Sequence, residues 1–359
     1  MAALSIHGNS STAARTRRPT ALLTVTLALA CTLASALTWA DAREFEMTIE
    51  DTRMTLVDKQ DFHTFAFNGQ VPGPLIHVKE GDDITVKVMN LTSLPHTIHW
   101  HGLLQRGTWQ NDGVPGVTQE AIKPGEDYTY HFVAAPSGTM WYHCHVNVNE
   151  HVAMRGMWGP LIIDPREPKP IEKAVTRDFI LMLADWDDKW ANKPGYGGVP
   201  GDVFNYFTIN GKAYPDTQPL RVKKGDVLRL RLIGAGELIH SIHIHGHVFK
   251  VAFKDGHALP APYEADTILV GPGERYDLIF EADNPGLWMV HDHVDSHTVN
   301  GEKPMGGIMT VIQYAEIDTT NSVYEWKNKP VQPDFFYEES LKAPYGLHTP
   351  ALFKGTAIQ

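Results

Sequence analysis

Eight histidines occur as four His-x-His pairs, and one cysteine lies inside the second pair. The pairs are His99 and His101, His143 and His145, His243 and His245, and His291 and His293, with Cys144 between His143 and His145. Residues i and i+2 of a strand point to the same face, so each pair would project two imidazoles together. Imidazole is a ligand for copper, zinc, iron and nickel. The spacing therefore predicts metal centres built on strands.

Cys144 would point away from the two histidines that flank it, because it lies between them on the same strand. A thiolate, imidazoles and a weak axial thioether are the ligands of a blue copper electron-transfer site. His96 precedes the first pair, His151 follows the cysteine, and Met154 and Met157 come next. We therefore expect His96, Cys144 and His151 to form such a site with one of the two methionines.

The histidine pairs belong to a unit that occurs twice in the chain. The motif from His96 to Gly102 recurs from His240 to Gly246 at an offset of 144 residues, and 143–145 recurs as 291–293 at an offset of 148. The second copy has Asp292 where the first has Cys144. A single histidine is more often an ordinary core or surface residue. Paired histidines that recur within an aligned repeat indicate a shared role.

Short alternating apolar runs such as 84–88 and 227–232, separated by Gly/Pro turns, predict strands, and no long amphipathic helix is indicated. We therefore predict an all-β protein in which each copy is a β-sandwich or barrel. The expected organisation is an export signal at 1–42, a first domain at 43–165, a second domain at 166–315 and a tail at 316–359. The tail is rich in aromatic residues, so we expect it to pack on the body or on a neighbouring subunit.

Composition excludes several classes of protein. The 359 residues are 43% hydrophobic and 20% charged, which argues against disorder. The net charge is −11, and it becomes −13 without the first 42 residues, which disfavours nucleic-acid binding. Arginines, an apolar run at 21–36 and small residues up to Ala42 predict an export signal rather than a membrane span, by either the general or the twin-arginine route. We expect a periplasmic or secreted protein in which Cys144 is the only cysteine.

Four ordered motifs carry a resemblance to a known family. They are His-Thr-Ile-His-Trp-His-Gly at 96–102, Asp-Gly at 112–113 with Thr-Gln at 118–119, Trp-Tyr-His-Cys-His at 141–145, and the histidine motif at 240–247. The chain resembles multicopper oxidases of the laccase type, and more narrowly their two-domain bacterial members with the blue copper in domain 1. The resemblance covers roughly residues 45–315 and implies two cupredoxin domains.

The resemblance also implies a role for each residue. His99 and His243 would bind the type 2 copper, and the type 3 pair would be held by His101, His143, His145, His245, His291 and His293. The type 1 copper would be held by His96, Cys144, His151 and Met157, which matches the family's Gly-Met, whereas Met154 does not. Asp112 would assist proton delivery to the cluster; its alternative role is a turn residue before Gly113.

Three departures from the family pattern matter. The position five residues after the cysteine is Asn149, and the histidine follows only at His151. Asp292 cannot replace a thiolate in a blue site, so we expect the second copy to have lost that copper, with His240, His297 and Met305 as remnants. A middle domain is absent, so the two halves of the cluster must meet within one chain or between chains; for two-domain relatives the family implies a homotrimer.

The predicted function is a laccase-like oxidase. It would couple one-electron oxidation of a phenol, an aromatic amine, a metal ion or a redox protein to the four-electron reduction of dioxygen to water. One alternative is a two-domain copper nitrite reductase, which has a single histidine before the cysteine and needs only three type 2 histidines. A non-catalytic copper-binding or electron-transfer protein and a structural protein with vestigial histidines are the others.

Overall fold

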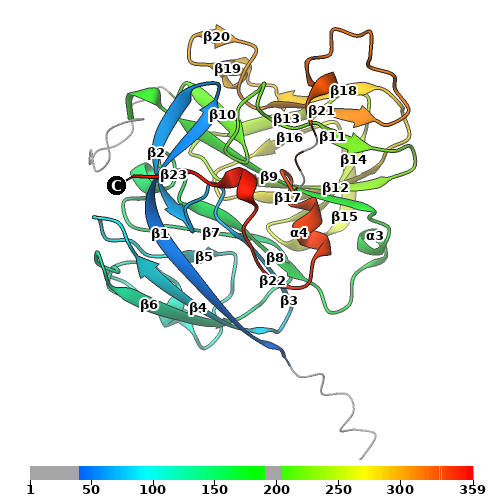
Figure 1. The fold of residues 1–359 in the computed structure, drawn as a ribbon. Coiled ribbons are helices and arrows are strands. Elements are labelled where there is room, and N and C mark those ends of the chain that lie inside the picture. The colour runs from blue at the N-terminus through cyan, green and yellow to red at the C-terminus, as the bar shows by residue number, and fades with distance from the viewer. Residues whose placement is uncertain (1–39, 191–203, 331, 333, 359) are drawn as a thin grey trace, which may run out of the picture. The chain divides into compact units, whose positions relative to one another are not determined.

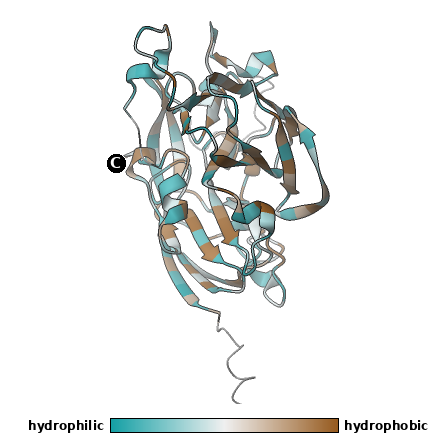
Figure 2. Ribbon diagram, turned by 90° about the vertical axis from the view of Figure 1, so that its right-hand side faces the viewer, coloured by the Kyte–Doolittle hydropathy of each residue, from teal (hydrophilic) through white to brown (hydrophobic). Residues whose placement is uncertain are grey.

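The alternating apolar runs of the sequence form strands, and these strands build two β-sandwiches (Figure 1). The computed structural model describes residues 40–190, 204–330, 332 and 334–358. Residues 1–39, which contain nearly all of the predicted export signal, lie outside the described residues. Hydrophobic residues lie mainly along the strands and hydrophilic residues in the loops (Figure 2). The predicted all-β class is confirmed.

The first sandwich consists of two sheets, which we call the β1 sheet and the β7 sheet. The β1 sheet has the order β2 (Gln60–Phe67), β1 (Ala42–Val57), β4 (Asp83–Asn90) and β6 (Asp127–Val133), with β23 (Thr356–Ala357) also paired to β1. The β7 sheet has the order β22 (Gly346–His348), β3 (Leu75–Lys79), β8 (Trp158–Asp164), β7 (Gly138–His143) and β5 (His99–His101). Apolar side chains of both sheets meet in one buried cluster.

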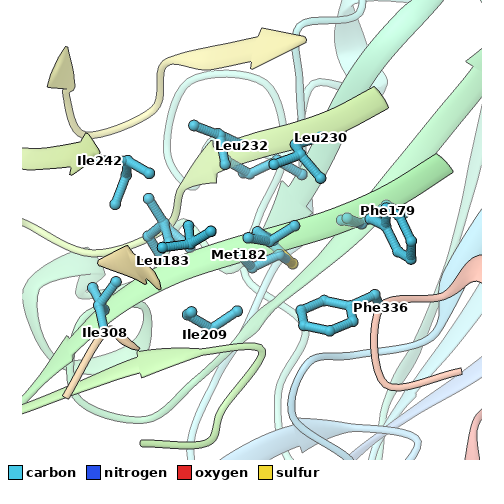
Figure 3. Close-up of a cluster of buried hydrophobic side chains, with 14 of the residues drawn as sticks. Phe179, Met182, Leu183, Ile209, Leu230, Leu232, Ile242, Ile308 and Phe336 are labelled. Atoms are coloured by element: carbon cyan, nitrogen blue, oxygen red, sulfur yellow. The ribbon is translucent and has the colours of Figure 1, made fainter. Parts of the chain in front are cut away.

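The second sandwich also consists of two sheets, the β12 sheet and the β18 sheet. The β12 sheet has the order β15 (His257–Ala265), β14 (Phe249–Lys254), β17 (Arg275–Glu281), β12 (Val227–Gly234), β9 (Arg177–Trp186), β10 (Tyr206–Ile209), β19 (Val299–Asn300) and β20 (Lys303–Pro304). The β18 sheet has the order β11 (Leu220–Val222), β21 (Met309–Tyr314), β18 (Leu287–Asp292), β13 (His240–Ile244) and β16 (Thr267–Val270). Figure 3 shows its core, where side chains of β9, β10, β12 and β13 meet.

The sequence repeat is also a repeat of strand order. The order β2-β1-β4-β6 in the first sandwich corresponds to β10-β9-β12-β17 in the second, and β3-β8-β7-β5 corresponds to β11-β21-β18-β13. The pairing senses agree as well, because β1 with β4 and β9 with β12 are parallel, and β5 with β7 and β13 with β18 are antiparallel. Corresponding motifs of the two copies therefore lie at corresponding places in the two sandwiches.

Helices are short throughout the described residues. The α-helices are α2 (Val148–His151), α3 (Pro170–Lys173) and α4 (Glu338–Lys342), and the 3-10 helices are η2 (Trp109–Asn111), η3 (Asp188–Trp190), η4 (Asp295–His297), η5 (Glu325–Asn328) and η6 (Ala351–Phe353). Within the part of the chain that the structure describes, no helix has the length and apolar character needed to cross a bilayer.

The two sandwiches share a buried junction. Phe62 of β2 packs edge-on against Trp186 of β9, with ring centroids 5.6 Å apart, and Trp158 of β8 lies 6.4 Å from the same tryptophan. A polar contact crosses the junction as well, because the Thr139 hydroxyl donates to Asp277 at 2.6 Å. Aromatic side chains each bury a large area, so this junction holds the two sandwiches in a defined arrangement.

The C-terminal segment packs on the body of the same chain. It runs back to the first sandwich, where β22 extends the β7 sheet and β23 pairs with β1 (Figure 1). Phe335, Phe336, Tyr337 and Phe353 are buried in the large core cluster. The segment is held by Asn210, whose amide donates to the carbonyl of Phe335 at 2.9 Å.

Replacing Asn210 with alanine should destabilise the protein strongly. The Asn210 side chain accepts from the Met182 amide at 2.8 Å and donates to the carbonyls of Ile180 and Phe335 at 2.8 and 2.9 Å, all in the core. The substitution leaves these buried groups without partners, and we expect a loss of about 3 kcal/mol in the free energy of unfolding, measured by urea denaturation.

Asn68→Ala is the matched control. Asn68 is the repeat partner of Asn210 and has the same φ of 51°, so both alanines are strained alike. The Asn68 side chain is half-buried, and its oxygen accepts from the Thr48 amide at 2.7 Å and from the Thr48 hydroxyl at 3.4 Å. We expect a loss of about 1 kcal/mol for this variant, and equal losses for the two would contradict the role assigned to Asn210.

Candidate functional site

Cys144 directly follows β7, and its thiol lies in the core between two imidazoles. Sγ is 3.7 Å from Nδ1 of His96 and 3.4 Å from Nδ1 of His151. His96 precedes β5 in a segment bridged to Ile122, and His151 is the last residue of α2. The Nε2 atom of His96 lies 2.8 Å from the Thr92 hydroxyl, which fixes the ring with Nδ1 toward the sulfur. These three residues, which the sequence predicts to act together, therefore lie together.

The two candidate methionines lie in different surroundings. Met157 is fully buried in the same cluster as Cys144. Its carbonyl accepts from the Cys144 amide at 3.1 Å, and its amide donates to the His151 carbonyl at 3.0 Å. Met154 belongs to a separate cluster with Ala153 and Trp190. The surroundings favour Met157 as the thioether neighbour of the thiol.

The donor set fits copper. Burial lowers the pKa of His96 to about 2 and that of His151 to about 4, so both imidazoles are neutral and keep a lone pair for a metal. Burial also raises the pKa of the Cys144 thiol to about 11, so binding a metal would displace the thiol proton. Phe65 packs against both rings, with centroids 5.1 Å away in each case, and helps to enclose the group.

Four histidines of the first sandwich form a second group, which we call the first histidine set. It consists of His99, His101, His143 and His145. Strand pairing places His99 of β5 directly opposite His143 of β7. The ring of His99 lies between 5.2 and 5.5 Å from the other three rings. Burial lowers the pKa of His101 to about 3 and also lowers those of His99 and His143, so these imidazoles are neutral and have a lone pair available for a metal.

Backbone carbonyls orient the rings of this set. Nδ1 of His99 donates to the carbonyl of Asp112 at 2.7 Å, and Nδ1 of His143 donates to the carbonyl of Cys144 at 2.8 Å. Such partners fix the tautomer and leave Nε2 free to bind a metal. The sequence singled out the Asp112 carboxylate, which lies 3.5 Å from the same nitrogen. The role of the Asp112 carbonyl was not predicted, because sequence motifs carry no signal for a backbone acceptor.

The second histidine set repeats this geometry in the second sandwich. It consists of His243, His245, His291 and His293. His243 of β13 lies opposite His291 of β18, and its ring is 4.8–5.9 Å from the other three. Nδ1 of His243 donates to the carbonyl of Asp266 at 2.8 Å, and Nδ1 of His291 donates to that of Asp292 at 2.9 Å. His245 and His293 are exposed, unlike their counterparts in the first set.

The two sets stay separate within one chain. Among the described residues, no ring contact or hydrogen bond joins a histidine of the first set to one of the second. His101 instead faces Gly273, where an added Cβ would lie 3.0 Å from its ring. One chain therefore presents two half-sites of four imidazoles.

The remnants predicted in the second copy divide into two groups. His240 and His297 surround Asp292 in a third buried cluster. Burial opposes charge on His240, but its contacts with Asp185 and Asp292 raise the pKa of His240 to about 9. Met305 is 64% exposed and lies outside this cluster, so the expectation that it survives as a remnant of the site is wrong. It lies in a surface turn after β20, where nothing brings its sulfur to the core.

Comparisons with known proteins place this geometry in a family. Two family models described as multicopper oxidase match residues 48–168 and 187–303. A blue copper oxidase from Nitrosomonas europaea is 67% identical, with a TM-score of 0.88 over 89% of this chain and 100% of that one. The multicopper oxidase mgLAC is 57% identical, with a TM-score of 0.87 over 88% of this chain and 100% of that one. The resemblance inferred from the motifs is thus confirmed.

Longer relatives match as well. Laccase-15 of Oryza sativa subsp. japonica is 31% identical over 86% of this chain and 54% of its own length. The chain spans about half the length of the curated relatives it matches. A copper nitrite reductase from Nitrosomonas europaea is 24% identical with a TM-score of 0.62 over 77% of this chain and 95% of that one, which shows a shared fold alone.

Gly113 should be required for the first histidine set. It has a φ of +85°, and a Cβ there would overlap the carbonyl oxygen of Ile98, next to His99. We expect Gly113→Ala to push the Asp112 carbonyl away from His99 and to lower metal binding by the set at least tenfold, measured by metal titration of the purified protein.

Gly116→Ala is the control for this prediction. Gly116 lies in the same loop with a similar φ of +73°, and a Cβ there meets nothing within 4 Å. It should cost about 1 kcal/mol of stability through backbone strain and leave metal binding unchanged. Equal metal binding by the two variants would mean that the contact with Ile98 does not position His99.

Proposed function

This chain belongs to the multicopper oxidase family, and we propose that it is an exported oxidase that takes electrons singly from a reducing substrate and reduces dioxygen to water. The observation that carries the proposal is the position of Cys144. Its thiol belongs to one candidate centre, while the residues on either side of it, His143 and His145, belong to another. The two centres are thus joined by a single stretch of backbone.

Copper is the metal of this family, and we assign its ligands by centre. The type 1 ligands are His96, Cys144, His151 and Met157, the type 2 ligands are His99 and His243, and the type 3 ligands are His101, His143, His145, His245, His291 and His293. Neutral buried imidazoles, a buried thiol and a nearby thioether support the first assignment. The ring contacts and carbonyl-oriented nitrogens within each histidine set support the others.

Copper held by these residues would supply the one-electron redox chemistry and the reduction of dioxygen. The chain supplies the path between the centres. From Cys144 that path runs along the backbone to His143, and it is shortened by the hydrogen bond from Nδ1 of His143 to the Cys144 carbonyl at 2.8 Å. Because dioxygen needs four electrons and the donor gives one at a time, an entry site separate from the reducing site is useful.

Asp112 is the proposed proton donor. Its carboxylate lies 3.5 Å from Nδ1 of His99, and the side chain is 30% exposed, so it reaches both the first histidine set and solvent. A carboxylate in this position can take a proton from water and pass it inward. Its carbonyl meanwhile holds His99, so the residue would combine proton delivery with ring positioning.

The two half-sites would meet between subunits of a homotrimer. Each set is bordered by exposed apolar side chains: Leu104, Trp109 and Val117 follow the first pair, while Ile239, Val248 and Leu269 flank the second. Exposed apolar groups of this kind mark contact surfaces. A head-to-tail contact between unlike faces forms a ring when its rotation closes, and three subunits would then share three clusters.

Several substrate classes fit this proposal: phenols, aromatic amines, metal ions and redox proteins. The buried type 1 ligands favour a donor that delivers electrons through the protein surface rather than one that binds the metal.

The export signal predicted at 1–42 supports a periplasmic or secreted location. A nitrite reductase needs only three type 2 histidines, so the eight paired imidazoles favour the oxidase.

Cys144→Ser should separate electron entry from metal binding by the cluster. A serine hydroxyl is a poor copper ligand, so the intense visible band of a copper-thiolate site and the oxidase turnover should both disappear. Copper analysis should show a loss of about one ion from about four per chain, because the histidine sets remain. Turnover that persists without the band would contradict the electron path through Cys144.

Mixed subunits test whether the half-sites meet between chains. A His99→Ala/His101→Ala variant and a His243→Ala/His245→Ala variant should each be inactive alone. Co-assembled in equal amounts in a head-to-tail ring, they should regain roughly a quarter of the wild-type activity, because one interface in four pairs two intact halves. A mixture that stays inactive although the trimers form would indicate that each cluster lies within one chain.

A further inference from the structure

Asp292 occupies the position in the second sandwich that Cys144 has in the first. The Asp292 amide donates to the Ile308 carbonyl at 3.1 Å, as the Cys144 amide does to Met157. The Ile308 amide donates to the His297 carbonyl at 3.1 Å, as that of Met157 does to His151 at 3.0 Å. Ile308 therefore takes the place of the thioether, and it lies among the buried side chains of the core (Figure 3). Its side chain has no donor atom for a metal.

The Asp292 carboxylate is fully occupied by hydrogen bonds. Oδ2 accepts from Nδ1 of His240 at 2.7 Å and from Nδ1 of His297 at 2.8 Å. Oδ1 accepts from the amides of Ser241 and Val294 at 2.9 and 3.0 Å. A carboxylate offers about four lone-pair sites, and all four are engaged.

Both ring nitrogens of His240 lie close to a carboxylate. Its Nδ1 faces Asp292, and its Nε2 lies 3.0 Å from Oδ1 of Asp185. Oδ2 of Asp185 accepts from the amides of Glu237 and Leu238, so that carboxylate is anchored on the backbone. His240, Asp185 and Asp292 are 0% exposed, and a buried charge needs partners of this kind.

Hydrogen bonds occupy the space around Asp292. The donor and acceptor atoms are 2.7 and 2.8 Å apart, which is the ordinary length of a hydrogen bond to oxygen. The N···S separations around Cys144, 3.4 and 3.7 Å, are longer because sulfur is the larger atom. The two groups therefore differ in their central acceptor atom.

The network is tied to the histidine set beside it. Ser241, which donates to Asp292, lies on β13 between His240 and His243. Val294, the other backbone donor, directly follows His293, and the His293 amide donates to the Ser241 carbonyl at 2.7 Å. One carboxylate oxygen therefore joins the end of β18 to the strand that carries His243.

We infer that Asp292 is a positioning residue: its carboxylate, with His240 and His297, replaces a second thiolate-metal site by a saturated hydrogen-bond network that fixes His291, His293 and β13 for the shared cluster. The inference rests on the proposed function, because it assigns the flanking histidines to that cluster. The second sandwich would thus hold its half-site with hydrogen bonds at the position where the first has the donor set of His96, Cys144 and His151.

Asp292→Asn tests the inference in the full-length, copper-loaded protein. The amide nitrogen cannot accept hydrogen bonds, so one side of the network must break. We expect copper to fall from about four to about one per chain while the visible band of the Cys144 site stays at wild-type intensity. Loss of cluster copper with an unchanged visible band distinguishes positioning of the cluster from general destabilisation, which would remove the band as well.

Asp295→Asn is the matched control, because Asp295 is exposed and lies three residues further along. It removes the same charge and should leave copper content and spectrum unchanged.

A pair of substitutions covers the case in which Asp292→Asn does not fold. His297→Asn keeps an N–H donor near the position of Nδ1 and should retain the cluster copper, whereas His297→Ala should lose it.

Proton NMR of the metal-free protein separates this inference from the proposed function. Two downfield imidazole N–H signals, from His240 and His297, should be present in the wild type and absent in Asp292→Asn, whether or not the protein is an oxidase. Full cluster copper in Asp292→Asn would overturn the inference. A fifth metal ion per chain in the wild type that is lost in Asp292→Asn would also overturn it, because the group of Asp292, His240 and His297 would then be a metal site.

Discussion

Strand alternation at the end of β7 is the constraint on which the candidate centres depend. Because neighbouring residues of an extended chain point to opposite sides, His143, Cys144 and His145 place one thiol in the core and two imidazoles on the other side. No helix or loop would impose this split so directly. The thiol then meets His96 and His151, while the imidazoles meet His99 across the β5 and β7 pairing.

The same constraint operates in the second sandwich with a different central residue. Asp292 is the core-facing residue between His291 and His293, and the surrounding strand order and backbone hydrogen bonds are those of the first copy. A soft thiol beside two imidazoles suits a metal, whereas a carboxylate in contact with two imidazole N–H groups forms hydrogen bonds. One fold can therefore place either a thiol suited to a metal or a hydrogen-bonded carboxylate at the same position.

The packed junction between the sandwiches bears on how the two half-sites could meet. Phe62, Trp158 and Trp186 pack across the two sandwiches, and Thr139 and Asp277 add a buried polar contact. The C-terminal segment covers the same region with Phe336 and Tyr337 in the core cluster. A chain held in this way is not expected to bring its own two sets together by bending, which supports the proposed contact between chains.

The sequence by itself determined the properties that depend on residues close together along the chain. The His-x-His spacing, the repeat and the alternating apolar runs specified strands, the two copies and the residues able to bind metal, because these properties depend only on residue type and period. They also indicated that Asp292 breaks the pattern of the first copy. Motif spacing favoured Met157 over Met154, and burial beside Cys144 points the same way.

Only the tertiary structure decided which groups face one another across the chain. The carbonyls of Asp112 and Asp266 orient His99 and His243, and no residue type marks a backbone acceptor in a sequence. Ile308, rather than Met305, occupies the thioether position of the second copy, because the backbone contacts with Asp292 and His297 set the register there. Distances between residues remote in sequence follow from packing, and packing is a property of the whole fold.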